Sequence, residues 1–191
     1  MNKRSKEGLE KVIFNAALEI FSEYGYEGAG MRMIASRAGM SVGSLYLHGK
    51  NKEQLFFSMM ERYFESVLCE VEKAVGKTTN PVDALRALVR TNMKLAKKNK
   101  ALFLAKDRSR HKREMELKRD FFRAQRTFIE EIIGKGVKDG HFGLCDQRKT
   151  AKIVMSAIRG FIFSMVFNPD NLFSYEECSK LLMKGLLKRN D

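Results

Sequence analysis

The chain has no tryptophan, only two prolines and three cysteines among its 191 residues. The scarcity of proline removes the strongest helix breaker, and Leu, Lys, Met and Glu, which favour helices, are abundant. The sequence therefore predicts a mostly helical protein. The cysteines are odd in number and widely spaced, at Cys69, Cys145 and Cys178. This pattern argues against both a disulfide framework and a zinc site.

A long uninterrupted hydrophobic segment is also missing. The longest apolar run covers residues 153–167, which is 15 residues, and contains Ser156, Arg159 and Ser164. A membrane-spanning helix needs about 20 apolar residues, and no apolar segment follows the basic residues at the N-terminus. We therefore expect a soluble, cytoplasmic protein that does not associate with a membrane.

Basic residues outnumber acidic ones, 36 to 23, which gives a formal net charge of +13 and suggests a polyanionic partner. The excess is uneven. Residues 1–56 hold eight basic and six acidic residues, whereas residues 97–126 hold twelve and four. We interpret stretch 97–126 as a solvated helix face. The alternative is that it attracts DNA or binds an anionic group of an effector.

Helical periodicity is present along the whole chain and predicts an all-α fold of about nine helices with no strand. The expected helices cover residues 5–24, 31–38, 42–48, 52–75, 81–99, 100–106, 107–138, 146–167 and 174–187. Asn80-Pro81, Asp146 and Ser174 carry the start signals of three of these helices. Glycines stand where several others should end.

Residues 31–46 have the spacing of a helix-turn-helix. Ala35 is small enough to allow a close helix crossing, Gly39 can adopt the positive φ that reverses the chain, and Leu45 follows ten residues after Ala35. This leaves small side chains facing outward, as entry into a DNA major groove requires. The alternative is two short core helices joined by a glycine turn.

The wider context resembles the N-terminal domain of the tetracycline-repressor (TetR) family of transcriptional regulators. The similarity runs in register over about residues 9–56 and includes Gly25-Tyr26-Glu27-Gly28 and the segment from Leu45 to Leu55. It implies a homodimer that binds double-stranded operator DNA through a domain at residues 1–51. Residues 52–191 would then form an effector-binding and dimerisation domain.

The resemblance also implies residue roles. Phosphate contacts would come from Arg32, Tyr46, His48 and Lys52, and base contacts from Ser41, Val42, Gly43, Ser44 and Leu47. The sequence departs from the family at Ala29 and Gly30, where hydroxyl residues are usual, at Met33, which replaces a common acid, and at Gly49, which replaces a usual phenylalanine. We therefore expect fewer contacts with DNA phosphates, and we expect the second helix of the motif to be held more loosely.

The remaining residues suggest a pocket and an interface. Apolar residues with a few polar ones among them would line an effector pocket: Phe64, Leu68, Leu88, Asn92, Phe103, Phe122, Gln125, Phe128 and Phe161. An ordinary helical core is the alternative. The surplus apolar faces of the last two helices predict a dimer interface at Ile158, Ile162, Met165, Leu182 and Leu186.

Catalytic function has little support in the sequence. The three histidines are far apart, and neither a phosphate-binding glycine loop nor a nucleophile elbow occurs. We predict no catalytic residue, metal or cofactor, and interpret the chain as a repressor released from a palindromic operator by a hydrophobic or amphipathic small molecule. The alternative is a helical small-molecule-binding protein or enzyme with a vestigial DNA-binding motif.

Overall fold

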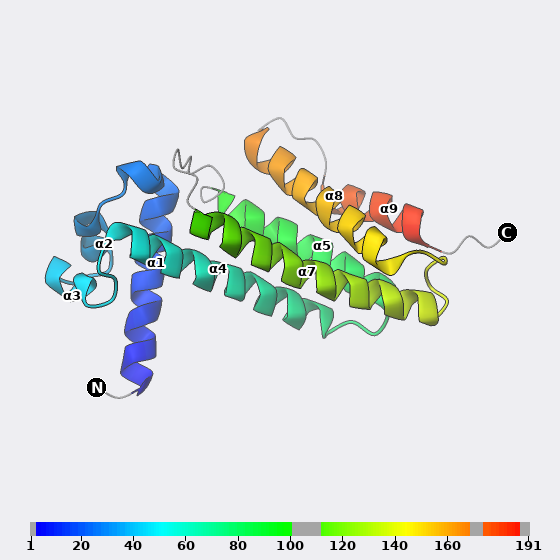
Figure 1. Ribbon diagram of the computed structural model, residues 1–191, viewed down its shortest axis with the longest axis horizontal. Helices are drawn as coiled ribbons and strands as arrows, with labels where there is room; N and C mark the ends of the chain where they lie inside the picture. The colour runs from blue at the N-terminus through cyan, green and yellow to red at the C-terminus, as the bar shows by residue number, and fades with distance from the viewer. Residues whose placement is uncertain (1–2, 101–111, 169–173, 188–191) are drawn as a thin grey trace. The chain divides into compact units, whose positions relative to one another are not determined.

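The computed structural model describes residues 3–100, 112–168 and 174–187, and all the regular elements in these ranges are helices (Figure 1). They are α1 (Lys3–Gly28), α2 (Met31–Arg37), α3 (Val42–Tyr46), α4 (Lys52–Val75), α5 (Pro81–Lys98), α7 (Lys112–Lys138), α8 (Gln147–Phe167) and α9 (Tyr175–Leu186). The all-α prediction is confirmed. The short helix expected at 100–106 falls almost entirely outside the described residues.

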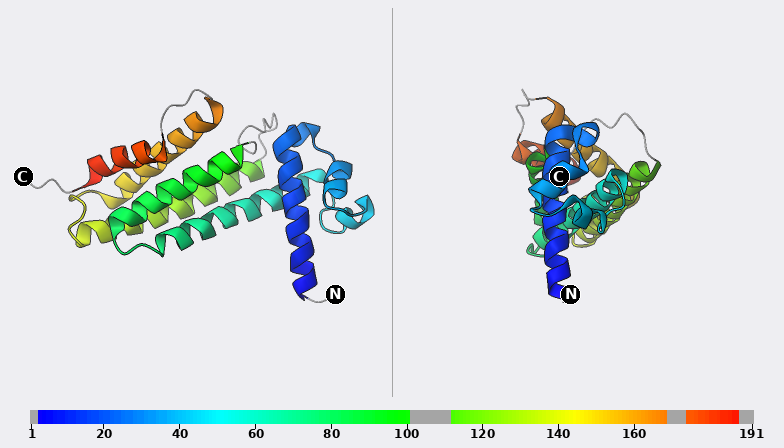
Figure 2. Two further views of the ribbon diagram at one scale, coloured as in Figure 1. Left: turned by 180° about the vertical axis from the view of Figure 1, so that it is seen from behind. Right: turned by 90° about the vertical axis from the view of Figure 1, so that its left-hand side faces the viewer.

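The helices form two compact units. The N-terminal unit comprises the described residues of Met1–Phe64 and Asn99–Leu117, and the C-terminal unit those of Glu65–Lys98 and Lys118–Asp191. Helix α4 continues from one unit into the other, so the N-terminal unit extends past residue 51 and includes the first half of α4. In the C-terminal unit the helices run lengthwise beside one another (Figure 2), with α5 packed against both α8 and α9.

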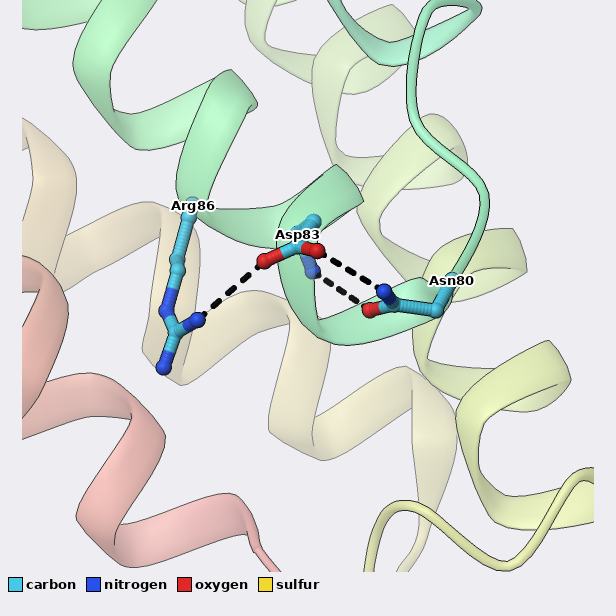
Figure 3. Close-up of polar contacts among 3 residues, drawn as sticks. All are labelled: Asn80, Asp83 and Arg86. Carbon is cyan, nitrogen blue, oxygen red and sulfur yellow. Dashed lines mark hydrogen bonds and ion pairs between the residues drawn. The ribbon is translucent and has the colours of Figure 1, made fainter.

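The predicted start signals fold as local caps. Asn80 Oδ1 accepts from the Asp83 amide at 2.9 Å, and Asn80 Nδ2 donates to the Asp83 carboxylate at 2.8 Å (Figure 3). Arg86 binds the other carboxylate oxygen at 3.1 Å. Asp146 caps α8, and Ser174 forms a capping box with Glu177 at the start of α9. Each cap satisfies an amide that the first helical turn leaves without a partner.

The core of the N-terminal unit combines the apolar faces of α1 and α4 with the two short helices. Phe21 of α1 is fully buried and meets Phe56 of α4 edge to face, with ring centroids 5.0 Å apart. Ile34 of α2 and Leu45 of α3 are also fully buried in this core. Full burial of such a side chain contributes about 1.5–3 kcal/mol. The short helices are therefore held by packing rather than by their own length.

The C-terminal unit contains one close backbone approach. Gly136 of α7 faces the ring of Phe142, which is 2% exposed, and a Cβ on Gly136 would lie 2.0 Å from a ring carbon. Phe142 also forms an isolated bridge with Leu187. Only a glycine lets the ring lie against the helix at this point.

Helix α8 is longer than its apolar run. It has 21 residues, its most apolar window has a mean hydropathy of 1.5, and 28% of that window is buried. By length and composition alone it is the one helix among the described residues that could cross a membrane. The 15-residue apolar run in the sequence thus underestimated the apolar length of the helix.

Candidate nucleic-acid interface

The turn between α2 and α3 is a Schellman motif. Gly39 has φ +66°, as the sequence predicted. Its amide donates to the Ser36 carbonyl at 3.1 Å, and the Met40 amide donates to the Ala35 carbonyl at 3.0 Å. These two bonds satisfy carbonyls at the end of α2 and reverse the chain. The helix-turn-helix geometry expected for residues 31–46 is therefore present.

Helix α3 is short, and it is held at its start and on its inner face. Ser41 caps its start, because Ser41 Oγ accepts from the Ser44 amide at 3.1 Å. Leu45 is fully buried and anchors the inner face. Tyr46 and Leu47 point outward, with 46% and 86% of their surface exposed. A helix held in this way presents its outer side chains without needing stability of its own.

The predicted base-contacting residues occupy the outer side of this helix. Gly43 and Ser44 are exposed together with Leu47, and Val42 is half-buried. Ser41 is also exposed, but its hydroxyl is engaged as the cap and lies 2.9 Å from Ser44 Oγ. The small residues let the backbone approach a groove, and Leu47, the cap residue directly after α3, is the most exposed apolar side chain beside them.

The predicted phosphate-contacting residues differ in their surroundings. Arg32 is exposed in the first turn of α2, and the cap residue Gly30 supplies no side-chain hydrogen bond, as the departure from the family pattern suggested. Tyr46 exposes its ring. His48 is half-buried and lines a cavity of about 250 Å³ between α1 and α4, which Glu10 and Arg62 also line.

Lys52 has partners that the sequence did not reveal. Its Nζ donates to the carbonyls of Tyr26 at 2.9 Å, Ala29 at 3.2 Å and Glu27 at 3.4 Å, and it lies 4.7 Å from the centroid of the Tyr26 ring. An ammonium group has three N–H donors, so these carbonyls account for all of them. Lys52 fastens the start of α4 to the end of α1. Its phosphate contact stays a prediction.

Gly49, where the resemblance led us to expect a phenylalanine, is buried. A Cβ at this position would lie 3.2 Å from Leu55 Cβ, so Leu55 covers the glycine directly. Two backbone bonds run from Gly49 and His48 to the Leu45 carbonyl, at 3.2 and 2.9 Å. The end of α3 is thus held by Leu55 and by main-chain bonds.

Some of the charged side chains in the N-terminal unit form ion pairs with one another. Arg37 binds both Glu19 and Glu23 of α1, and the hydrogen bond that it donates to the Glu19 carboxylate raises the pKa of the guanidinium. In the basic stretch, Arg113 binds Glu61 at 2.9 Å and lies over the ring of Phe57. Residues 101–111, which hold several of its other charges, are outside the described structure. The sequence did not reveal these ion pairs because the partners are far apart along the chain.

Comparison with known proteins agrees with this geometry. The family model of the bacterial regulatory proteins of the tetR family matches residues 13–59, which run from α1 through the helix-turn-helix into α4. Residues 13–59 belong to the TetR family. The match ends within α4, so it covers the helix-turn-helix and leaves out the C-terminal unit.

A curated protein similar to this chain is the HTH-type transcriptional activator FasR of Mycolicibacterium smegmatis. It is 39% identical over 74 residues, which span 39% of this chain and 34% of FasR. The similarity to FasR thus covers only about a third of that protein. Together with the family match and the exposed α3, it identifies the chain as a DNA-binding transcriptional regulator.

Two solved structures share the fold over nearly the whole chain. The regulator FadR from Bacillus subtilis in complex with stearoyl-CoA has a TM-score of 0.78 at 19% identity, and the match covers 92% of this chain and 98% of FadR. AibR in complex with isovaleryl coenzyme A and operator DNA has a TM-score of 0.67 at 24% identity and covers 94% and 98%. These similarities extend the shared fold to the C-terminal unit.

Proposed function

We propose that the chain is a homodimeric repressor that binds a palindromic operator through α3 and leaves it when a small amphipathic molecule binds the C-terminal unit. The observation that carries the proposal is the presentation of α3, with Leu45 buried, Ser41 capping, and Gly43, Ser44 and Leu47 exposed. Two such helices, one helical turn or a multiple of it apart, would read two half-sites.

The dimer contact is proposed at the outer face of α8 and at α9. Phe163 and Phe167 are 64% and 43% exposed, with ring centroids 4.6 Å apart, and Leu181 is 66% exposed. Such an apolar face is costly to leave in water. Ile162, Met165, Leu182 and Leu186 are half-buried and fit this interface, but Ile158 is fully buried within its own chain, so the proposal omits it.

A membrane fits the same face less well. The first two turns of α8 carry Arg148, Lys149 and Lys152, and Arg159 lies mid-helix with its guanidinium 4.3 Å from the centroid of the Phe122 ring. A charge near the middle of a spanning helix is costly. We therefore propose a cytoplasmic protein that buries α8 against a second copy.

The proposed effector site lies in the C-terminal unit. FadR and AibR, the two structural relatives, are described as complexes with acyl thioesters of coenzyme A, so this class is the first to test. Of the expected pocket residues, Leu68, Gln125 and Phe128 line one cavity, and Asn92 forms a hydrogen bond with Gln125. Leu88 is fully buried, and the Phe122 ring contacts the guanidinium of Arg159. Phe64 and Phe161 are half-buried. Phe103 lies outside the described residues.

The route from effector to DNA is proposed to run along α4. This helix begins at Lys52, which is bonded to the end of α1, and ends at Val75, so its second half belongs to the C-terminal unit. A ligand that binds one position of α4 better than another would shift the population of the two states. The separation of the two reading helices would change with it.

The test is quantitative footprinting on genomic DNA upstream of the gene, with Tyr46→Phe and Leu47→Ala beside the wild type. Both residues are exposed, so both variants should fold. Tyr46→Phe should weaken binding to every DNA site by about threefold to tenfold, because one hydrogen bond to a phosphate is lost. Leu47→Ala should change the order of site preference.

Equal, salt-labile binding by all three proteins would contradict the proposal. That result would favour a helical binding protein or enzyme with a vestigial motif. Transcription in vitro from the bound promoter decides between repression and activation, which matters because FasR is named as an activator.

A further inference from the structure

A groove in the C-terminal unit lies between the second half of α4 and α7. It has a volume of about 230 Å³. Helix α4 contributes Leu68, Val71 and Glu72, and α7 contributes Ala124, Gln125, Thr127, Phe128 and Glu131. The groove therefore combines an apolar lining with one buried amide and two carboxylates.

The buried amide is the end of a chain of hydrogen bonds. Asn92 Nδ2 donates to the Leu88 carbonyl at 3.0 Å, and Gln125 Nε2 donates to Asn92 Oδ1 at 2.8 Å. The order of these groups is forced, because a carbonyl oxygen only accepts. The Leu88 carbonyl thus orients the Asn92 amide, and Asn92 in turn orients the Gln125 amide. The Gln125 Nε2 faces Asn92, and its Oε1 is not used in this chain of bonds.

Gln125 Oε1 is left without a donor. The side chain is 1% exposed, and no described residue donates to its oxygen. A buried acceptor without a donor costs about 1–3 kcal/mol, and buried polar groups in folded proteins are rarely left in this state. Because the amide order is fixed from Leu88, the missing partner must be a hydrogen-bond donor.

The charges beside the groove also favour a ligand whose polar end is neutral or positively charged. Glu72 and Glu131 are exposed at its rim, and none of the described residues that line it is basic. Two carboxylates beside an apolar groove disfavour an anion and favour a neutral or positively charged group. A carboxylate ligand would also bring no donor for Gln125.

We infer that this groove binds an apolar molecule whose polar end carries an N–H or O–H donor, and that Gln125 Oε1 accepts from that donor. The inference rests on the proposed effector function and names the chemistry of the effector at this point. Oε1 has almost no exposed surface, so the ligand reaches it by displacing a half-buried wall residue such as Phe128. Filling the vacant hydrogen bond offsets that displacement.

Isothermal titration of the full chain with octanol, octylamine and octanoate tests this inference, since the three probes differ only at the polar end. Octanol and octylamine should bind, and octanoate should bind at least about tenfold more weakly, because it repels the rim carboxylates and donates nothing. The double variant Glu72→Gln with Glu131→Gln changes exposed residues only. It should weaken the binding of octylamine about threefold to tenfold and leave the binding of octanol unchanged. The comparison separates the contribution of the ammonium charge from that of the hydroxyl group.

Two variants examine the amide itself. Gln125→Met removes the acceptor and should reduce the preference for octanol over octanoate to the part that repulsion by Glu72 and Glu131 supplies. Asn92→Leu frees the Gln125 amide to turn its nitrogen outward, so the discrimination against octanoate should shrink even if Gln125→Met does not fold. Octanoate binding as tightly as octanol to the wild type, or an unchanged preference in folded Gln125→Met or Asn92→Leu, would overturn the inference.

Operator binding without ligand keeps the two proposals apart. If the wild type binds its operator but the octyl probes bind without discrimination, only the donor site fails. If the wild type discriminates among the probes but binds no operator, the proposed regulatory function fails instead.

Discussion

The ammonium of Lys52 lies 2.9 Å from the carbonyl oxygen of Tyr26 and 4.7 Å from the centroid of the Tyr26 ring. One side chain thereby joins the first residue of α4 to the last turns of α1. A cation at a helix C-terminus offsets the partial negative charge of the free carbonyls there. The contact fixes the frame on which the helix-turn-helix is mounted.

Replacing Lys52 should therefore destabilise the N-terminal unit. We expect Lys52→Met to lower the free energy of unfolding by about 1–3 kcal/mol, because it leaves the carbonyls of Tyr26 and Ala29 without a charged donor. Urea denaturation followed by circular dichroism measures this. Lys50→Met is the matched control at an exposed neighbour. Equal stability of the two variants would mean that the contacts of Lys52 with the end of α1 do not stabilise the unit.

Gly136 should tolerate no larger side chain. In Gly136→Ala the new Cβ would clash with the Phe142 ring, and we expect a loss of about 2 kcal/mol or more from overpacking. Gly8→Ala is the control, because Gly8 is exposed in α1 with nothing within 4 Å of a Cβ. It should be neutral or should stabilise the helix by about 0.5–1 kcal/mol. Thermal melts of both variants decide the matter, and similar melting temperatures would refute the close approach.

Stability should fall in alkaline solution for a reason specific to two buried groups. Burial raises the pKa of the Cys178 thiol from 9.0 to about 11, and that of the Tyr63 hydroxyl from 10.0 to about 12. Both groups are neutral when protonated, so the unfolded chain ionises first. The stability they contribute is complete below pH 9 and is lost as the pH rises toward 11 and 12.

The double variant Tyr63→Phe with Cys178→Ala should lose less stability than the wild type between pH 8.5 and about 10.5. Urea denaturation at a series of pH values measures the difference, and comparing slopes removes the contribution of the lysines common to both proteins. Parallel curves for wild type and variant would show that neither group drives the alkaline loss.

The outer face of α8 should control association. Phe163→Glu places a charge on the proposed interface and should convert a dimer to a monomer, with the dissociation constant rising at least about a hundredfold for a central buried aromatic residue. Sedimentation equilibrium measures it. Leu144→Glu adds the same charge at another apolar residue that is 96% exposed, and it should leave association unchanged. A dimer that persists in Phe163→Glu would move the interface elsewhere.

The sequence by itself determined the local structure. Asn80, Asp146 and Ser174 cap the helices they were expected to cap, and Gly39 adopts the expected positive φ. Each of these features depends on partners within about five residues along the chain, so backbone geometry and residue type suffice. The helix-turn-helix was predictable for the same reason.

Only the tertiary structure decided the contacts between distant residues. Lys52 meets Tyr26 across 26 residues, and Gln125 meets Asn92 across 33. Periodicity marks which face of a helix is buried, but it does not fix the rotation and depth at which two helices meet. Those two quantities bring the Lys52 ammonium to the carbonyls at the end of α1 and leave the buried Gln125 Oε1 without a donor among the described residues.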